Sequence, residues 1–244
     1  MPLLEIDRVS KRFGGLRAIS DASFSIGENE IVFLVGPNGA GKTTMFNLIT
    51  GFLHPDEGHI RFRGEDVTNI TPNRAARLGI GRTFQIVKPI GSLTVLENVM
   101  LGAFLHTSSR STAAAEAREV LAFLKMEAVA DLVARDLPLA TLKRLEIARA
   151  LATKPRLILL DEVVSGLATS EALALAGLLK KLPERGVAAV GGVEHVMRVV
   201  MTIADRVVVL DHGAQIAEGK PREVMQLPQV VEAYLGTKYR ERNL

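Results

Sequence analysis

Cysteine is absent from this chain of 244 residues. Without thiols the protein forms no disulfide, holds no zinc–thiolate site and uses no cysteine nucleophile. Positive charge is only slightly in excess, because 30 lysines and arginines stand against 27 aspartates and glutamates, a formal net charge of +3. That balance gives no argument for nucleic acid as a partner, although it is compatible with an anionic ligand.

Long apolar segments are missing as well. No window approaches the roughly 18 consecutive apolar residues of a membrane-spanning helix, and the first residues carry charges where a signal peptide would have its apolar core. We therefore expect a protein that reaches a membrane only through other subunits. Hydrophobic residues make up 48% of the chain, which is enough for a packed core, and the length suits a single domain over 1–244.

Strand and helix patterns alternate over much of the chain and predict an α/β fold. Two continuous apolar runs, 30–35 and 157–160, predict buried strands. Alternation of apolar and polar residues predicts short strands over 3–8 and 22–26. Helical periodicity predicts a helix over roughly 142–153, directly before the second apolar run.

A glycine-rich segment follows the first apolar run and precedes a helical pattern. It satisfies G-x-x-x-x-G-K-[ST], the pattern of loops that bind nucleotide phosphates. Glycines let backbone N–H groups converge on one anion, and the N-terminus of the next helix adds partial positive charge. We expect Lys42 to contact the β- and γ-phosphates, the Thr43 hydroxyl to bind Mg²⁺, and Thr44 to reach the α-phosphate. The residues predicted to bind the nucleotide here are Gly36, Pro37, Asn38, Gly39, Ala40, Gly41, Lys42, Thr43 and Thr44.

Two acidic residues end the second apolar run. In enzymes with such a phosphate loop, a neighbouring strand ends in an aspartate that holds Mg²⁺, and Asp161 suits that role. Glu162 would then face the γ-phosphate and could polarise an attacking water. We therefore expect ATP and Mg²⁺ as ligands, with hydrolysis of the γ-phosphate as the reaction.

The stretch from about 88 to 150 differs from both flanks, because almost all of it has helical periodicity. Thr94 and Glu97 form a capping box that predicts the start of one of its helices. We interpret 88–150 as a helical subdomain inserted into one nucleotide-binding core, which is formed by 1–87 and 151–244.

These motifs, in this order, make nearly the whole chain resemble the ABC ATPase family. The resemblance implies a P-loop NTPase (RecA-like) core with an antiparallel β region and an inserted helical subdomain. It also implies that Phe13 stacks on adenine, that Gln85 contacts Mg²⁺ and the attacking water, and that His195 contacts the γ-phosphate. The catalytic residues would be Lys42, Gln85, Glu162 and His195, and the metal ligands would be Thr43, Gln85 and Asp161.

Several phrases are similar to the ATP-binding subunits of bacterial branched-chain amino acid importers. They are FNLITGF (46–52), GRTFQ (81–85), LTVLENVMLGAF (93–104), RLEIARALA (144–152) and ADRVVVLDHG (204–213). The resemblance implies a peripheral motor at the cytoplasmic face of the inner membrane. Its partners would be a second ABC ATPase subunit, identical or different, transmembrane permease subunits and, indirectly, a solute-binding protein. It further implies a docking groove for a permease helix over 86–100, with exposed apolar residues such as Ile90, Leu93 and Val95.

Two segments depart from the family pattern. The signature L-S-G-G-Q falls on residues 137–141, where only the leucine agrees. In the family this loop contacts the γ-phosphate bound by the opposite subunit, through a serine hydroxyl and glycine N–H groups. Pro138 has neither group and Leu139 adds bulk. After the second acid the family has proline and, further on, aspartate, where this chain has Val163 and Ala168.

These departures leave two hypotheses open. In the first, the pair of subunits is asymmetric, and this chain completes one ATP site but weakens the other. In the second, this branch of the family uses a variant signature and both sites work. The alternative functions are a soluble ABC ATPase that assembles another complex and a regulatory ATP-binding subunit with weak hydrolysis. A small-molecule kinase is disfavoured by the helical insert between Lys42 and Asp161.

Overall fold

The computed structural model describes residues 1–84, 88–192 and 197–235. Its strands are β1 (Leu4–Phe13), β2 (Leu16–Ile26), β3 (Ile31–Val35), β4 (Glu57–Phe62), β5 (Glu65–Asp66), β6 (Ile80–Arg82), β7 (Leu157–Asp161), β8 (Ala188–Gly192), β9 (Arg206–Asp211) and β10 (Ala214–Gly219). Its α-helices are α1 (Lys42–Ile49), α2 (Pro72–Leu78), α3 (Val95–Ala103), α4 (Arg110–Phe123), α5 (Leu139–Leu151), α6 (Thr169–Leu179), α7 (Met197–Ile203), α8 (Pro221–Val224) and α9 (Pro228–Leu235). Within these ranges no helix is long and apolar enough to cross a bilayer.

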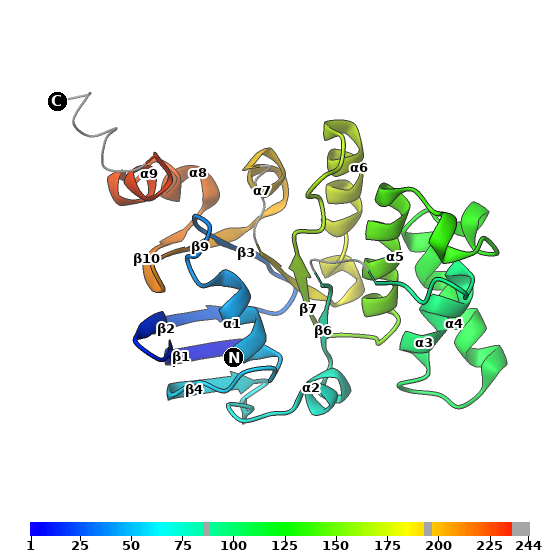
Figure 1. The fold of residues 1–244 in the computed structure, drawn as a ribbon, viewed down its shortest axis with the longest axis horizontal. Helices are drawn as coiled ribbons and strands as arrows, with labels where there is room; N and C mark the ends of the chain where they lie inside the picture. Colours follow the sequence, from blue (N-terminus) through cyan, green and yellow to red (C-terminus); the bar gives the residue numbers. More distant parts are fainter. Residues whose placement is uncertain (85–87, 193–196, 236–244) are drawn as a thin grey trace.

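The strands form a sheet with an antiparallel half and a parallel half, in the order β5-β4-β1-β2-β10-β9-β3-β8-β7-β6 (Figure 1). β1, β2, β4 and β5 pair antiparallel, whereas β9, β3, β8, β7 and β6 pair parallel. β10 runs antiparallel to β9 and meets β2 through one parallel pair, Ala214 and Ser20. All residues of β3 and β7 are buried, as expected for parallel strands covered on both faces.

Two hydrophobic clusters cover the two faces of the sheet. Ile31, Phe33 and Val35 of β3 pack into one cluster with α3 to α8, while Val32 and Leu34 pack into the other with α1 and the antiparallel strands. This division follows from the alternation of side chains along a strand. Because β9, β3, β8, β7 and β6 are parallel, their carboxyl ends lie at the same edge of the sheet, where open α/β sheets bind their ligands.

A helical layer lies between β6 and β7 in the chain and stands beside the sheet, on the right in Figure 1. It contains α3, α4, α5 and the 3₁₀ helices Glu127–Val129 and Ala134–Asp136. The predicted capping box at its start is confirmed: the Thr94 hydroxyl accepts from the Glu97 N–H at 3.2 Å, and the Glu97 carboxylate accepts from the Thr94 N–H at 3.0 Å. The division into a core and a subdomain at residues 88 and 150 stays a prediction.

Some predicted boundaries were wrong for identifiable reasons. The strands expected over 3–8 and 22–26 are parts of a longer hairpin, formed by β1 and β2. Their length was underestimated because shifts of register along β1 break the alternation of apolar residues. β6 was not predicted, since three residues are too few to show a period. Helix α5 begins at Leu139 instead of near 142. The prediction missed its first turn because Leu139 is apolar but 48% exposed, and so does not fit a buried apolar stripe.

Candidate active site

The phosphate loop turns between β3 and α1. Gly36, Gly39 and Gly41 have φ angles of 148°, 81° and 103°, which side-chain-bearing residues rarely adopt. A methyl group on Gly36 would lie 2.0 Å from the carbonyl oxygen of Leu210, and one on Gly41 would lie 2.5 Å from that of Ala18. At Gly39 a methyl group would meet nothing within 4 Å. Positions 36 and 41 therefore need glycine for space as well as for backbone conformation.

Lys42 begins α1, and its side chain folds over the loop. Its Nζ donates to the carbonyl oxygens of Gly36 at 2.6 Å and Pro37 at 2.5 Å. The residue is only 4% exposed. Burial lowers the pKa of Lys42, while the charges of Glu162 and Asp161 oppose that shift. The arrangement places an ammonium group between the anion-binding loop and two carboxylates.

A cavity of about 370 Å³ opens beside the loop. It brings together Phe13 from the end of β1, Lys42 and Thr44 from α1, and Glu162. Phe13 is 45% exposed, so its ring is not part of the core and can stack on a planar ligand, although Lys11 Nζ lies 5.8 Å from the ring centroid. The volume is in the range of about 300–1,000 Å³ typical of small-molecule sites. The other lining residues are Leu16, Arg17, Ala18, Asn38, Gly39, Ala40, Gly41, Thr43 and His212.

Asp161 ends β7 and is 3% exposed. Its backbone N–H donates to the Thr83 hydroxyl at 3.0 Å, and its carboxylate accepts from Arg82 Nη2 at 3.3 Å. Burial raises the pKa of the Asp161 carboxyl, and the guanidinium of Arg82 opposes that rise. The sequence did not predict either partner, because a lone arginine on a short strand and the threonine after it form no motif.

Glu162 follows in a left-handed conformation, with φ of 50°. Non-glycine residues seldom adopt it, and functional sites are where such residues gather. Lys143 of α5 donates from Nζ to the carbonyl oxygen of Glu162 at 2.8 Å, and the Ser165 N–H donates to the same oxygen at 3.2 Å. These bonds hold the backbone of the residue that we predict to orient water. Nothing in the sequence around Lys143 indicated this contact.

Thr43 and Asp161 both line a second cavity, next to the first. A hydroxyl and a carboxylate fit Mg²⁺, which prefers oxygen ligands, keeps several waters and binds phosphates in nucleotide sites. Within the described ranges there is no cluster of three or more acidic, histidine or cysteine side chains that could hold a metal.

Gln85 and His195 lie outside the described residues. The segment that contains His195 lies between the end of β8 at Gly192 and the start of α7 at Met197. The roles of both residues, like those of the other site residues, stay predictions.

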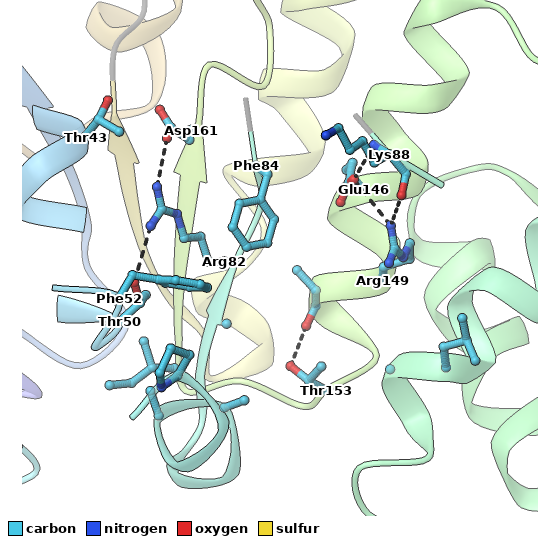
Figure 2. Close-up of a pocket in the computed structure, with 18 residues that line it drawn as sticks. Thr43, Thr50, Phe52, Arg82, Phe84, Lys88, Glu146, Arg149, Thr153 and Asp161 are labelled. Atoms are coloured by element: carbon cyan, nitrogen blue, oxygen red, sulfur yellow. Dashed lines mark hydrogen bonds and ion pairs between the residues drawn. The ribbon is translucent and has the colours of Figure 1, made fainter. Parts of the chain in front are cut away.

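The second cavity has a volume of about 760 Å³ and forms a groove between the core and the helical layer (Figure 2). Phe52 and Phe84 line its core side, 53% and 47% exposed, with ring centroids 6.0 Å apart in an edge-to-face arrangement. On the far side, Arg149 Nη1 donates to the carbonyl oxygen of Lys88 at 3.1 Å, and the Lys88 N–H donates to Glu146 Oε1 at 3.2 Å. The groove thus combines an apolar wall with a charged one.

The prediction of exposed apolar residues over 86–100 was partly wrong. Val95 is completely buried, because it forms the first turn of α3 and faces the core, and Leu93 is half-buried. Ile90 is exposed, as predicted. The exposed apolar residues of the second cavity are Phe52, Phe84 and Leu101, which lie too far apart in the sequence to form a recognisable pattern.

A strand, a glycine-rich loop and a helix, beside a parallel strand that ends in two carboxylates, define a P-loop nucleotide-binding protein. Comparison with known proteins gives the family. The family model described as ABC transporter matches residues 19–165, and the one described as branched-chain amino acid ATP-binding cassette transporter matches 214–240. The chain belongs to the ABC transporter family and is one of its ATPases.

Individual relatives agree with this assignment. The high-affinity branched-chain amino acid transport ATP-binding protein BraF of Pseudomonas aeruginosa is 36% identical over 250 residues, which cover 96% of this chain and 98% of that protein. The ADP conformation of an ATP-binding cassette of an ABC transporter is similar with a TM-score of 0.88 and 33% identity, covering 97% and 99% of the two chains. A dimeric cassette in a post-hydrolysis state, bound to ADP and phosphate, has a TM-score of 0.80 and 29% identity, covering 90% and 99%. The predicted α/β P-loop fold is confirmed.

Proposed function

We propose that this ATPase powers the import of branched-chain or related amino acids. The observation that best supports ATP hydrolysis is the 370 Å³ cavity, in which the phosphate loop, Lys42 and Glu162 meet. The chain that carries this cavity is 36% identical over nearly its full length to a branched-chain amino acid transport ATP-binding protein.

In the proposed reaction, N–H groups of the phosphate loop bind the phosphates of ATP while Phe13 stacks on the adenine ring. Glu162 accepts a hydrogen bond from a water molecule and orients it towards the γ-phosphorus. The oxygen of this water bonds to the γ-phosphorus as the bond between the γ-phosphorus and the bridging oxygen breaks, and the proton that the water loses ends on the inorganic phosphate released with ADP. Lys42 and His195 stabilise the charge that develops. Thr43, Gln85 and Asp161 would hold Mg²⁺, which when bound neutralises charge on the β- and γ-phosphates.

Transport would require a second ATPase subunit and membrane-spanning permease subunits. A related cassette is dimeric with ADP and phosphate bound, and we propose the same kind of pair here. The groove lined by Phe52, Phe84 and Leu101 suits an amphipathic helix, which places its apolar face in a hydrophobic groove. A permease helix in that groove would hold the chain at the cytoplasmic face of the membrane, and a solute-binding protein would deliver the amino acid.

The variant signature favours an asymmetric pair. Helix α5 begins directly at this segment with Pro138 as its N-cap, and no side chain caps it. The N–H groups of Leu139 and Ala140 still belong to the first helical turn, so the partial positive charge of a helix N-terminus is kept. The serine hydroxyl of the family is lost. This loss also supports a second candidate function, a regulatory subunit that binds ATP but hydrolyses it weakly.

Uptake of radiolabelled leucine into proteoliposomes that contain the permease and both ATPase subunits tests the proposal. We expect uptake that depends on ATP and stops when Lys42→Ala replaces the wild-type chain. Steady-state turnover with Glu162→Gln here, and with the equivalent change in the partner, tests the asymmetry, and unequal losses are expected. Equal losses contradict the asymmetric pair. Turnover without any binding to a membrane protein would favour the soluble ABC ATPase instead.

A further inference from the structure

Arg82 ends β6 and lines the groove, with its side chain only 7% exposed. Its Nη1 donates to Asn47 Oδ1 at 2.6 Å. Figure 2 shows its two other bonds, from Nη1 to Thr50 Oγ1 at 3.3 Å and from Nη2 to Asp161 Oδ2 at 3.3 Å. Asn47 and Thr50 lie at the end of α1, the helix that begins in the phosphate loop. One guanidinium therefore connects that helix to the carboxylate that ends β7.

Three aromatic rings surround the same guanidinium. Its central carbon lies 5.7 Å from the ring centroid of Phe46, 5.9 Å from that of Phe52 and 5.3 Å from that of Phe84. Cations within about 6 Å of a ring centroid are attracted to the ring, and more strongly when water is excluded. Phe46 is buried in the core, whereas Phe52 and Phe84 form the exposed wall of the groove. The position of Arg82 thus depends on groove residues as well as on buried ones.

The planar guanidinium suits this task better than an ammonium group would. It donates in two directions at once from a rigid fork, while a lysine is a point charge on a flexible stem. Within the described ranges Arg82 Nε is buried and has no hydrogen-bond partner, so the two Nη groups and the rings alone set the orientation. The bond to Asp161 Oδ2 restricts how the carboxylate can turn, and Arg82 makes no bond to the other oxygen, which can face a metal or a metal-bound water.

We propose that Arg82 is a positioning residue that fixes the Asp161 carboxylate for Mg²⁺ and joins it mechanically to the groove. Movement of Phe52 and Phe84 shifts the guanidinium, and the guanidinium shifts Asp161. This connection runs through Arg82 and does not include Gln85. The part of the proposal that concerns a docked helix rests on the proposed transport function, whereas the positioning of Asp161 does not.

The affinity of the ATP-bound chain for Mn²⁺, measured by electron paramagnetic resonance, tests the positioning. Loss of a group that orients a metal ligand typically costs about 10–100-fold in metal affinity. We expect a loss of that size for Arg82→Met, a smaller one for Arg82→Lys, and no change in ATP affinity in EDTA. Metal affinity as in the wild type for Arg82→Met would overturn the proposal.

Arg206→Met is the matched control. Arg206 is also partly buried and bonds to Glu30 and the Ser25 carbonyl oxygen, but it begins β9, at the edge of the parallel strands opposite the phosphate loop. We expect it to lower the unfolding temperature without changing the affinity for Mn²⁺. An equal loss of metal affinity in this variant would mean that both arginines act only through stability. Should Arg82→Met not fold, Asn47→Ala removes one anchor of the guanidinium and must itself weaken Mn²⁺ binding.

The connection to the groove has its own pair of variants. Phe52→Ala removes a ring that contacts Arg82, and Phe104→Ala removes a similarly exposed ring at the end of α3 that does not line the groove. We expect the first to weaken Mn²⁺ binding severalfold and the second to leave it unchanged. Equal effects contradict the connection. Because both are measured on the chain alone, a failure of amino acid uptake would count against the transport function and not against this inference.

Discussion

Single replacements of glycine by alanine in the phosphate loop separate backbone strain from lack of space. At Gly39 the added methyl group meets no atom within 4 Å, so only the positive φ opposes it, at a cost of about 1–2 kcal/mol. At Gly36 the methyl group would also lie 2.0 Å from the carbonyl oxygen and 3.0 Å from the carbonyl carbon of Leu210. These are main-chain atoms of β9, which cannot rotate away. Overpacking adds about 1–3 kcal/mol, for a total of about 2–5 kcal/mol at Gly36.

Urea unfolding followed by circular dichroism measures these free-energy costs. Titration with a fluorescent ATP analogue measures the affinity of the phosphate loop for nucleotide. Gly41→Ala should resemble Gly36→Ala, because its methyl group would lie 2.5 Å from the Ala18 carbonyl oxygen. We expect Gly39→Ala to keep most of its stability, and the other two variants to lose both stability and affinity for the analogue. A Gly36→Ala variant as stable as Gly39→Ala would refute the packing that we describe around the loop.

Three further predictions concern the capping box, a surface carboxylate and the adenine contact. Thr94→Ala should lower the free energy of unfolding by about 1 kcal/mol, through loss of a helix cap. Thr71→Ala should lower it less, because Thr71 makes no side-chain cap bond. Equal losses of the two variants in urea unfolding would contradict this. Hydrogen bonds from Lys11 and the Arg12 N–H lower the pKa of Asp56 below 3.8, so its contribution to stability is present above that pH and is lost as the pH falls through the lowered value. Asp56→Asn should therefore lower the melting temperature at pH 7 and match the wild type in strong acid, and a difference that persists in acid would argue against the ion pair. Phe13→Ala should weaken ATP binding about tenfold, since stacking on a base contributes about 1–3 kcal/mol, while Leu16→Ala, at the same hairpin tip, should weaken it less.

The parts of the site that could be predicted from the sequence are contiguous in it. The phosphate loop can be predicted because one continuous segment of the sequence supplies the strand end, the turn and the helix N-terminus. The buried strands around it are short and continuously apolar, which gave their positions to within a residue. The capping box is local in the same sense.

What could not be predicted depends on contacts between distant residues. Arg82 and Asp161 are separated by 79 positions, and their pairing follows from β6 lying beside β7. Lys143 reaches the Glu162 carbonyl oxygen only because α5 packs against the end of β7. The exposed apolar wall of the groove likewise forms because Phe52 and Phe84, distant in the sequence, meet in the fold. Val95 was expected to be exposed, but the fold buries it.

Binding of Mg-ATP to the purified chain, compared between the wild type and Lys42→Ala by isothermal titration calorimetry, tests the central claim most directly. Loss of charged hydrogen bonds from one ammonium group costs about 1.5–3 kcal/mol, so the affinity of Lys42→Ala should fall roughly 10–100-fold. Equal affinity in the two proteins, or no binding by the wild type alone or with its partner subunits, would contradict a nucleotide site at residues 36–44.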